Sequence, residues 1–303
     1  LRFDVRGTVI DAYSILSGTT RNCSGGPTPW NTYLSCEENG PDGQVWECDP
    51  FTPSQGVVRP LLGSFNHEAA VVDPATGDVY LTEDQYDGRL YRFTTTMPGQ
   101  LDVGVLKAAS VDLSNISTET ALLEWHTVRS DAPDRSPATT EFRGGEGAWI
   151  HRGRLLFSTK HDKRVWELNL TTQRLRLIHD CLAHPNLALD DVDAVVVHEY
   201  TGDIFVAEDP GNMRLGLIEE RPGTTAVSTF LQFVGHETSE VTGIAFDLSG
   251  SRLYVSSQRG VDGAGNGVTF EIGGPFGGLL GNVRVPLDGL QPAERRPSSP
   301  RGR

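Results

Sequence analysis

Acidic side chains recur at two places in a repeated unit of this sequence, and one cysteine accompanies them. The first column is the fourth position of five short apolar segments: Cys36, Glu83, Thr159, Glu208 and Ser257. The second column opens an apolar segment 13 to 17 residues before its partner in the first: Glu68, Glu146, Asp193 and Glu240. Carboxylates that converge in a narrow space repel one another, and multivalent cations relieve that repulsion. The two columns therefore predict metal binding.

The donor types indicate which metals would bind. Carboxylate oxygens suit calcium, magnesium, manganese or ferric iron, and a thiolate among them favours a transition metal. We expect Cys36 to be a ligand, because it shares a column with Glu83 and Glu208, and we expect a structural role for Cys23. The expected carboxylate ligands are Glu37, Glu38, Glu68, Glu83, Glu146, Asp193 and Glu208. The residues expected to support the ligands are His67, Asp84, Asp209 and Glu240.

Three basic residues are candidates for binding an anionic substrate beside these acids: Lys160, Arg143 and Arg259. Lys160 stands where Glu37 and Asp84 stand in their own repeats, so its ammonium could hold an anion or pair with a neighbouring acid. His67 directly precedes Glu68, where it could act as a general acid or pack in the core.

The segments that position these residues indicate strands in a repeat. Successive fourth positions are 47, 76, 49 and 49 residues apart, and a spacing near these shorter values is typical of one four-stranded propeller blade. The longer spacing predicts an insertion within Thr94–Phe142. Leu1–Leu16 resembles the outer strands of a further blade whose inner strands are missing. We therefore predict an all-β, six-bladed β-propeller with an incomplete first blade, and a β-sandwich is the alternative.

Composition agrees with a β protein and excludes several classes. The chain has 34 glycines and 18 prolines among its 303 residues, a composition rich in turn-forming residues. Helical periodicity is scarce, and Thr118–Val128 is the best candidate for a helix. The net charge of −14 argues against nucleic-acid binding, and no apolar run is long enough for a transmembrane helix. The propeller domain is expected over 1–285 and a disordered tail over 286–303. We expect a monomer.

Several motifs resemble those of the PhoX family of bacterial alkaline phosphatases, in the same order along the chain. They are Arg21-Asn-Cys-Ser-Gly-Gly-Pro-Thr-Pro-Trp30, Ser35-Cys-Glu-Glu38, Phe65-Asn-His-Glu-Ala-Ala70, Tyr80-Leu-Thr-Glu-Asp84, Gly144-Gly-Glu-Gly147, Val206-Ala-Glu-Asp209 and Ser256-Ser-Gln-Arg259. The resemblance extends from about residue 1 to residue 277 and is greatest to the shorter members of the family.

The resemblance implies a six-bladed propeller that is secreted or periplasmic and hydrolyses phosphate monoesters with an iron–calcium cluster. The iron-ligating cysteine of the family falls on Cys36. The cluster carboxylates of the family fall on Glu37, Glu38, Glu68, Glu146, Asp193 and Glu208. The family segment with the export signal and the inner strands of the first blade has no counterpart here, so we expect this chain to be truncated at its N-terminus.

Metal-dependent hydrolysis of a small phosphorylated substrate is thus the expected function. A calcium-dependent propeller lactonase is one alternative, although such a site needs few acids and this sequence has many. A non-catalytic propeller that binds structural calcium and serves as a binding platform is the other.

Overall fold

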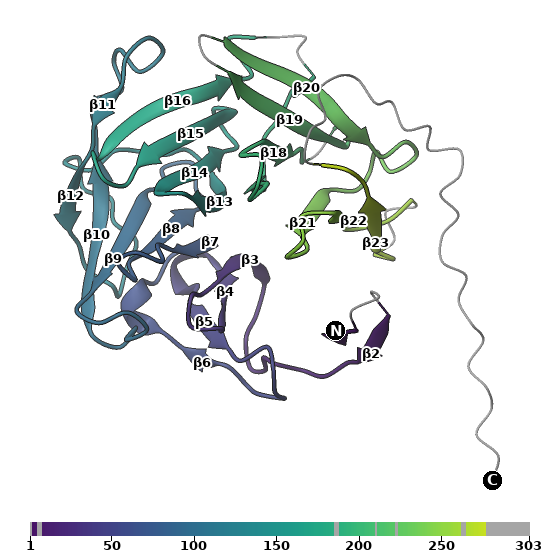
Figure 1. Cartoon of the computed structure of the whole chain (residues 1–303). Coiled ribbons are helices and arrows are strands. Elements are labelled where there is room, and N and C mark those ends of the chain that lie inside the picture. Colours follow the sequence, from purple (N-terminus) through teal and green to yellow (C-terminus); the bar gives the residue numbers. More distant parts are fainter. Residues whose placement is uncertain are drawn as a thin grey trace.

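The sheets of the protein are arranged in a ring around a central axis (Figure 1). The structure is a computed structural model, and it describes residues 2–4, 8–184, 188–209, 211–221, 224–261 and 265–276. Within this part of the chain the helices are two short 3-10 turns, η1 (Gly40–Asp42) and η2 (Pro60–Leu62). No helix found there is long and apolar enough to cross a membrane.

Five antiparallel sheets form the blades. The first two blades contain β3 (Asn22–Pro27), β4 (Tyr33–Glu37), β5 (Val45–Cys48) and β6 (Val57–Val58), then β7 (His67–Val72), β8 (Val79–Glu83), β9 (Leu90–Thr95), β10 (Gly104–Ser110) and β12 (Glu124–Thr127). The third contains β13 (Gly145–His151), β14 (Arg154–Thr159), β15 (Arg164–Asn169), β16 (Arg174–Asp180) and β11 (Ala121–Leu122). The last two contain β17 (Val195–Val197), β18 (Ile204–Ala207), β19 (Arg214–Arg221) and β20 (Thr224–Gln232), then β21 (Val241–Phe246), β22 (Arg252–Ser257) and β23 (Val268–Gly273).

The predicted propeller is confirmed, but its blade count differs from the expected six. The described residues form five blades and a separate two-stranded sheet, β1 (Arg2–Phe3) with β2 (Val9–Asp11). This sheet lies between the last blade and the first (Figure 1), and the ring centroids of Phe3 and Tyr254 are 6.3 Å apart. The N-terminal segment therefore supplies two short strands at that place in the ring. The predicted tail, 286–303, lies outside the described residues.

The expected insertion is present, but the helix expected at Thr118–Val128 is wrong. That segment contains β11, which pairs with β16 of the third blade, and β12, which pairs with β10 of the second. Trp125 donates a hydrogen bond from Nε1 to Oε1 of Gln173 at 2.6 Å. Pairing with two existing sheet edges satisfies the backbone here, so tertiary contacts override a weak helical pattern.

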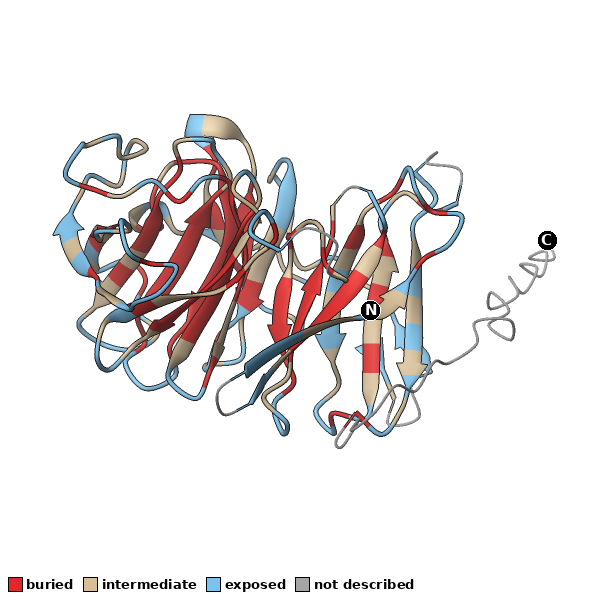
Figure 2. Ribbon diagram, turned by 90° about the horizontal axis from the view of Figure 1, so that it is seen from above, coloured by how far each residue is buried: buried red, intermediate tan, exposed pale blue. Residues whose placement is uncertain are grey.

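Apolar side chains between neighbouring blades hold the ring together. Figure 2 shows the buried residues concentrated on the strands and the exposed ones on the surrounding loops. Trp166 is fully buried and packs with Phe142 and Phe157 between the second and third blades. Burial of apolar surface stabilises such a fold by roughly 25 cal/mol per Å². The packed blades therefore give the axis a rigid frame for side chains at its end.

The opening strands of adjacent blades contact one another around the axis, namely β3 with β7, β7 with β13, β13 with β17 and β17 with β21. Two glycines permit the closest approaches. A Cβ on Gly26 would lie 2.3 Å from the carbonyl oxygen of Ala70, and one on Gly147 would lie 2.6 Å from Cα of Ala194. Larger residues would push these strands apart, and with them the side chains that the strands present.

Candidate metal centre

Irregularities in the opening strands aim three side chains at one place. The register of β3 shifts between Asn22 and Gly25, that of β7 between His67 and Ala70, and that of β13 between Gly145 and Ala148. Such bulges bend a strand and re-aim its side chains. The residues within these three bulges include Cys23, Glu68 and Glu146. The blades thus bring residues that are far apart in sequence to the same end of the axis.

Seven residues form what we call the cluster: Cys23, Glu38, Glu68, Glu146, Asp193, Asp209 and Glu240. They make three overlapping groups, and in each group one donor atom per residue lies within 4.8 Å of the others. The first group is Cys23, Glu38 and Glu68, the second is Glu68, Glu146 and Asp193, and the third is Asp193, Asp209 and Glu240. Consecutive groups share Glu68 and then Asp193, so the donors form a continuous row.

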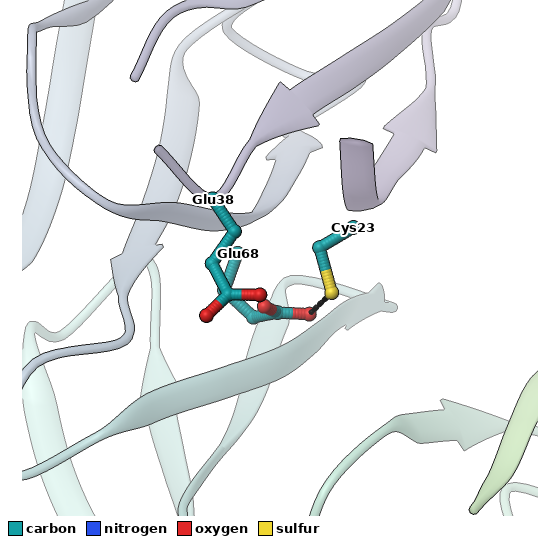
Figure 3. A group of neighbouring side chains, drawn as sticks. All are labelled: Cys23, Glu38 and Glu68. Atoms are coloured by element: carbon teal, nitrogen blue, oxygen red, sulfur yellow. Dashed lines mark hydrogen bonds between the residues drawn. The ribbon is translucent and has the colours of Figure 1, made fainter. Parts of the chain in front are cut away.

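The first group combines a sulfur with oxygens. Figure 3 shows Cys23, Glu38 and Glu68 turned toward one another, with the Cys23 thiol 3.1 Å from Oε1 of Glu68. Asn66 donates from Nδ2 to Oε1 of Glu38 at 3.4 Å and to the carbonyl oxygen of Asp84 at 2.7 Å. This arrangement offers a thiol and two carboxylates to one cation, and a sulfur among the donors favours a transition metal.

Two basic residues contact the row, one in its middle and one at the end farther from Cys23. Nζ of Lys160 lies 2.9 Å from Oε1 of Glu146, 3.3 Å from Oδ2 of Asp209 and 3.8 Å from Oδ2 of Asp193. Nη2 of Arg259 lies 3.3 Å from Oε2 of Glu240. Lys160 and Arg259, two of the three predicted basic residues, therefore lie at the cluster.

Burial and mutual repulsion raise the pKa values of the clustered carboxyls. Burial, and then the charge of Asp193, raises the pKa of Glu68 well above its usual range. Burial, and then Glu68, does the same to the pKa of Glu146. Burial is also the main cause that raises the pKa of Asp193, and the pKa values of Glu38 and Glu240 rise for the same reason. The charged carboxylate forms are therefore disfavoured here, and the two basic residues do not supply enough positive charge to offset this.

Three predicted ligands lie at equivalent positions away from the cluster. Glu37, Glu83 and Glu208 each accept a hydrogen bond from a backbone N–H at or just before the start of the next strand. The donors are the N–H groups of Gln44 at 3.1 Å, Arg89 at 3.0 Å and Arg214 at 3.2 Å. Glu83 also pairs with Nη2 of Arg135 at 2.7 Å. These acids fix the turns that join the second and third strands of their blades.

Cys36 and Cys23 have exchanged the environments that the sequence suggested. Cys36 is fully buried among Leu34, Val45 and Phe65 between the first two blades. Burial is the main cause that raises the pKa of the Cys36 thiol. Cys23 instead contacts Glu68 and belongs to the first group. All four cysteines are free thiols.

The other predicted residues have different surroundings. His67 is fully buried, its Nε2 is 3.0 Å from the carbonyl oxygen of Gly63, and its ring lies against Phe65. Burial lowers the pKa of His67 to about 3, so the imidazole is neutral and suits packing rather than acid catalysis. Arg143 lies over the ring of Tyr86 at 5.0 Å and close to Glu141, outside the three groups.

The raised pKa values predict that the metal-free protein loses stability as pH rises. A carboxyl whose pKa is higher in the folded chain than in the unfolded chain binds more protons when the chain is folded. It therefore stabilises the folded state fully below its unfolded pKa. This stabilisation is lost as the pH rises through its folded pKa. The melting temperature of chelator-treated protein should therefore fall from about pH 5 to about pH 8. Calcium should reduce this fall, because it replaces the protons. A metal-free melting temperature that rises across the same range would contradict the assignment.

Comparison with known proteins gives one family match and several structural likenesses. A search of curated proteins found no match. Among solved structures, a nidogen/laminin complex is 11% identical with a TM-score of 0.50 over 78% of this chain and 72% of that one. A gluconolactonase from Xanthomonas campestris is 10% identical with a TM-score of 0.47 over 76% and 67% of the two chains. The PQQ-bound aldose sugar dehydrogenase of Streptomyces coelicolor is 15% identical, with a TM-score of 0.39 over 87% and 96%. Likeness at such identities concerns the fold alone.

The family match covers part of the cluster itself. A sequence model described as alkaline phosphatase PhoX matches residues 5–45 and 40–152. The matched residues include all three members of the first group, Cys23, Glu38 and Glu68, and also Glu146 of the second group. This match assigns residues 5–152 of the chain to the PhoX family of alkaline phosphatases.

Proposed function

We propose that this protein is a metal-dependent phosphatase that hydrolyses small phosphate monoesters, and that it acts in the periplasm or outside the cell. The observation that carries the proposal is the row of three overlapping donor groups at one end of the axis. The family match supports the same reaction class. A site with so many partly buried acids is costly to maintain unless cations bind there.

The donors suit iron and calcium as the metals. The first group offers the sulfur of Cys23 with carboxylates of Glu38 and Glu68, a mixture that a transition metal prefers over calcium. The third group offers carboxylate oxygens alone, which calcium prefers. When bound, such metals supply Lewis-acid stabilisation of the charge on phosphoryl oxygens.

The protein's own residues would bind and orient the substrate. The guanidinium of Arg259 pairs with Glu240 at the end of the row and is 42% exposed, so it can also donate to a phosphoryl oxygen that approaches from solvent. Arg143 is 46% exposed and could contact the part of the substrate that is farther from the row. Without bound cations, the negative charges of the clustered acids would repel an anionic substrate.

Phosphate release from a panel of esters tests the proposal. Chelator-treated protein should be inactive toward p-nitrophenyl phosphate, and iron together with calcium should restore release of phosphate. A phosphodiester and a sugar lactone serve as comparison substrates. Metal-replete protein that is inert toward phosphate monoesters and diesters would contradict the proposal. Turnover of the lactone with calcium alone would instead favour a lactonase.

A further inference from the structure

Lys160 occupies a repeat position that holds an acid in three other blades. The residue directly after the second strand is Glu38, Asp84, Lys160 and Gln258 in the first, second, third and fifth blades, and in the fourth blade Asp209 follows that strand after Glu208. The equivalence is visible in the backbone of four blades, because the N–H of Glu38, Asp84, Lys160 and Gln258 each donates to the carbonyl just before the opening strand of its own blade. Three such bonds are Glu38 to Arg21 at 2.9 Å, Asp84 to Asn66 at 3.0 Å and Lys160 to Gly144 at 2.7 Å. The third blade thus places a cation where its neighbours place carboxylates.

The ammonium of Lys160 contacts two of the three donor groups. Glu146 belongs to the second group, Asp209 to the third and Asp193 to both, and Nζ is within 4.0 Å of all three. Its side chain is 26% exposed, so these contacts are partly shielded from water. The position of the ammonium among three carboxylates is that of a counter-ion shared by the two groups.

The first group has no such partner. Among the described residues, no lysine or arginine forms an ion pair with Glu38 or Glu68. Arg259 adds a second positive charge beside the third group through Glu240. Positive charge from the chain is therefore distributed unevenly along the row, with the first group left to a bound ion.

We propose that Lys160 is a resident cation that takes the place of a metal ion in the middle of the cluster and so limits the number of metal ions that the protein binds. Metal ions then bind at the first group and at those oxygens of the third group that do not contact Lys160. Removing the positive charge of Lys160 opens the second group, formed by Glu68, Glu146 and Asp193, as a new cation site. The inference rests on the proposed metal centre but does not require that the protein be a phosphatase.

Calcium titration of the chelator-treated protein by calorimetry tests the inference. Lys160→Gln should bind about one more calcium ion per chain than the unaltered protein, or bind calcium at least about tenfold more tightly. Lys160→Arg keeps the charge and should bind calcium as the unaltered protein does. Lys163→Gln is the matched control, because Lys163 pairs with Asp191 at 3.1 Å outside the three groups. The same number of ions and the same affinity in Lys160→Gln as in the unaltered protein would overturn the inference.

Thermal melting gives a second measurement if Lys160→Gln folds poorly without metal. The metal-free variant should melt at a lower temperature than the unaltered protein, because Glu146 and Asp193 lose their only described lysine partner. Calcium should raise its melting temperature by more than that of the unaltered protein. Equal responses to calcium would overturn the inference. Phosphate release is measured in parallel: absent activity with the expected calcium result would contradict the proposed function alone.

Discussion

Replacing Glu68 by glutamine is expected to lower phosphate release by at least about 100-fold and to remove bound metal. Glu68 belongs to both the first and the second donor group, and its side chain is buried between Cys23 and Glu146. Glutamine keeps the size of the side chain but removes its negative charge and one oxygen donor. One substitution therefore weakens two adjacent groups at once, which no other member of the first group does.

The matched control for this prediction is Glu199→Gln. Glu199 is 67% exposed and contacts the buried His151, outside the three groups, so its loss should leave metal content and turnover unchanged. Both variants are compared by phosphate release and by metal content per chain. Glu68→Gln with metal content and activity like those of Glu199→Gln would show that the cluster is not the reactive centre.

The second prediction with a large effect concerns Cys23 and Cys36, because only Cys23 lies at the donor groups. In cobalt-substituted protein, Cys23→Ser should abolish the thiolate-to-cobalt charge-transfer absorption, because the Cys23 sulfur is the one beside Glu68. Cys36→Ala should keep the absorption and lower the free energy of unfolding by about 1 kcal/mol or more, because it removes a fully buried side chain from the core.

Absorption spectra and urea denaturation of the two variants make the comparison. If Cys36→Ala lost the charge-transfer band while Cys23→Ser kept it, Cys36 would be the metal ligand, as the family resemblance implied. The cluster would then have to rearrange around bound metal, because Cys36 is now packed against Leu34 and Val45. The expected result instead places the sulfur ligand on β3.

The sequence predicted the propeller, and the same regular repeat grouped the acids of the second column, which the structure brings together. Glu68, Glu146, Asp193 and Glu240 all lie in the cluster. The first column was less informative. Glu83 and Glu208 stand at or just after the ends of strands, but they bind backbone N–H groups at or just before the start of the following strand, which a repeat alignment does not show.

The prediction that Cys36 is a metal ligand rests on an alignment of the repeats that is shifted by one residue in the first blade. The hydrogen bonds of Glu37 match those of Glu83 and Glu208, so Glu37 is the true counterpart of those acids and Cys36 precedes it. Successive side chains in a strand point to opposite faces, so a shift of one residue turns the side chain from one face to the other. The bulge that aims Cys23 at Glu68 has no clear mark in the sequence apart from two adjacent glycines, Gly25 and Gly26.

The metal content of the purified protein, measured by elemental mass spectrometry without added metals, tests the central claim most directly. We expect iron together with calcium, because the cluster combines the Cys23 sulfur with carboxylates that need positive charge. Protein that folds and contains neither metal would contradict the proposed metal centre, since the cluster would then be stable with Lys160 and Arg259 as its only cations among the described residues.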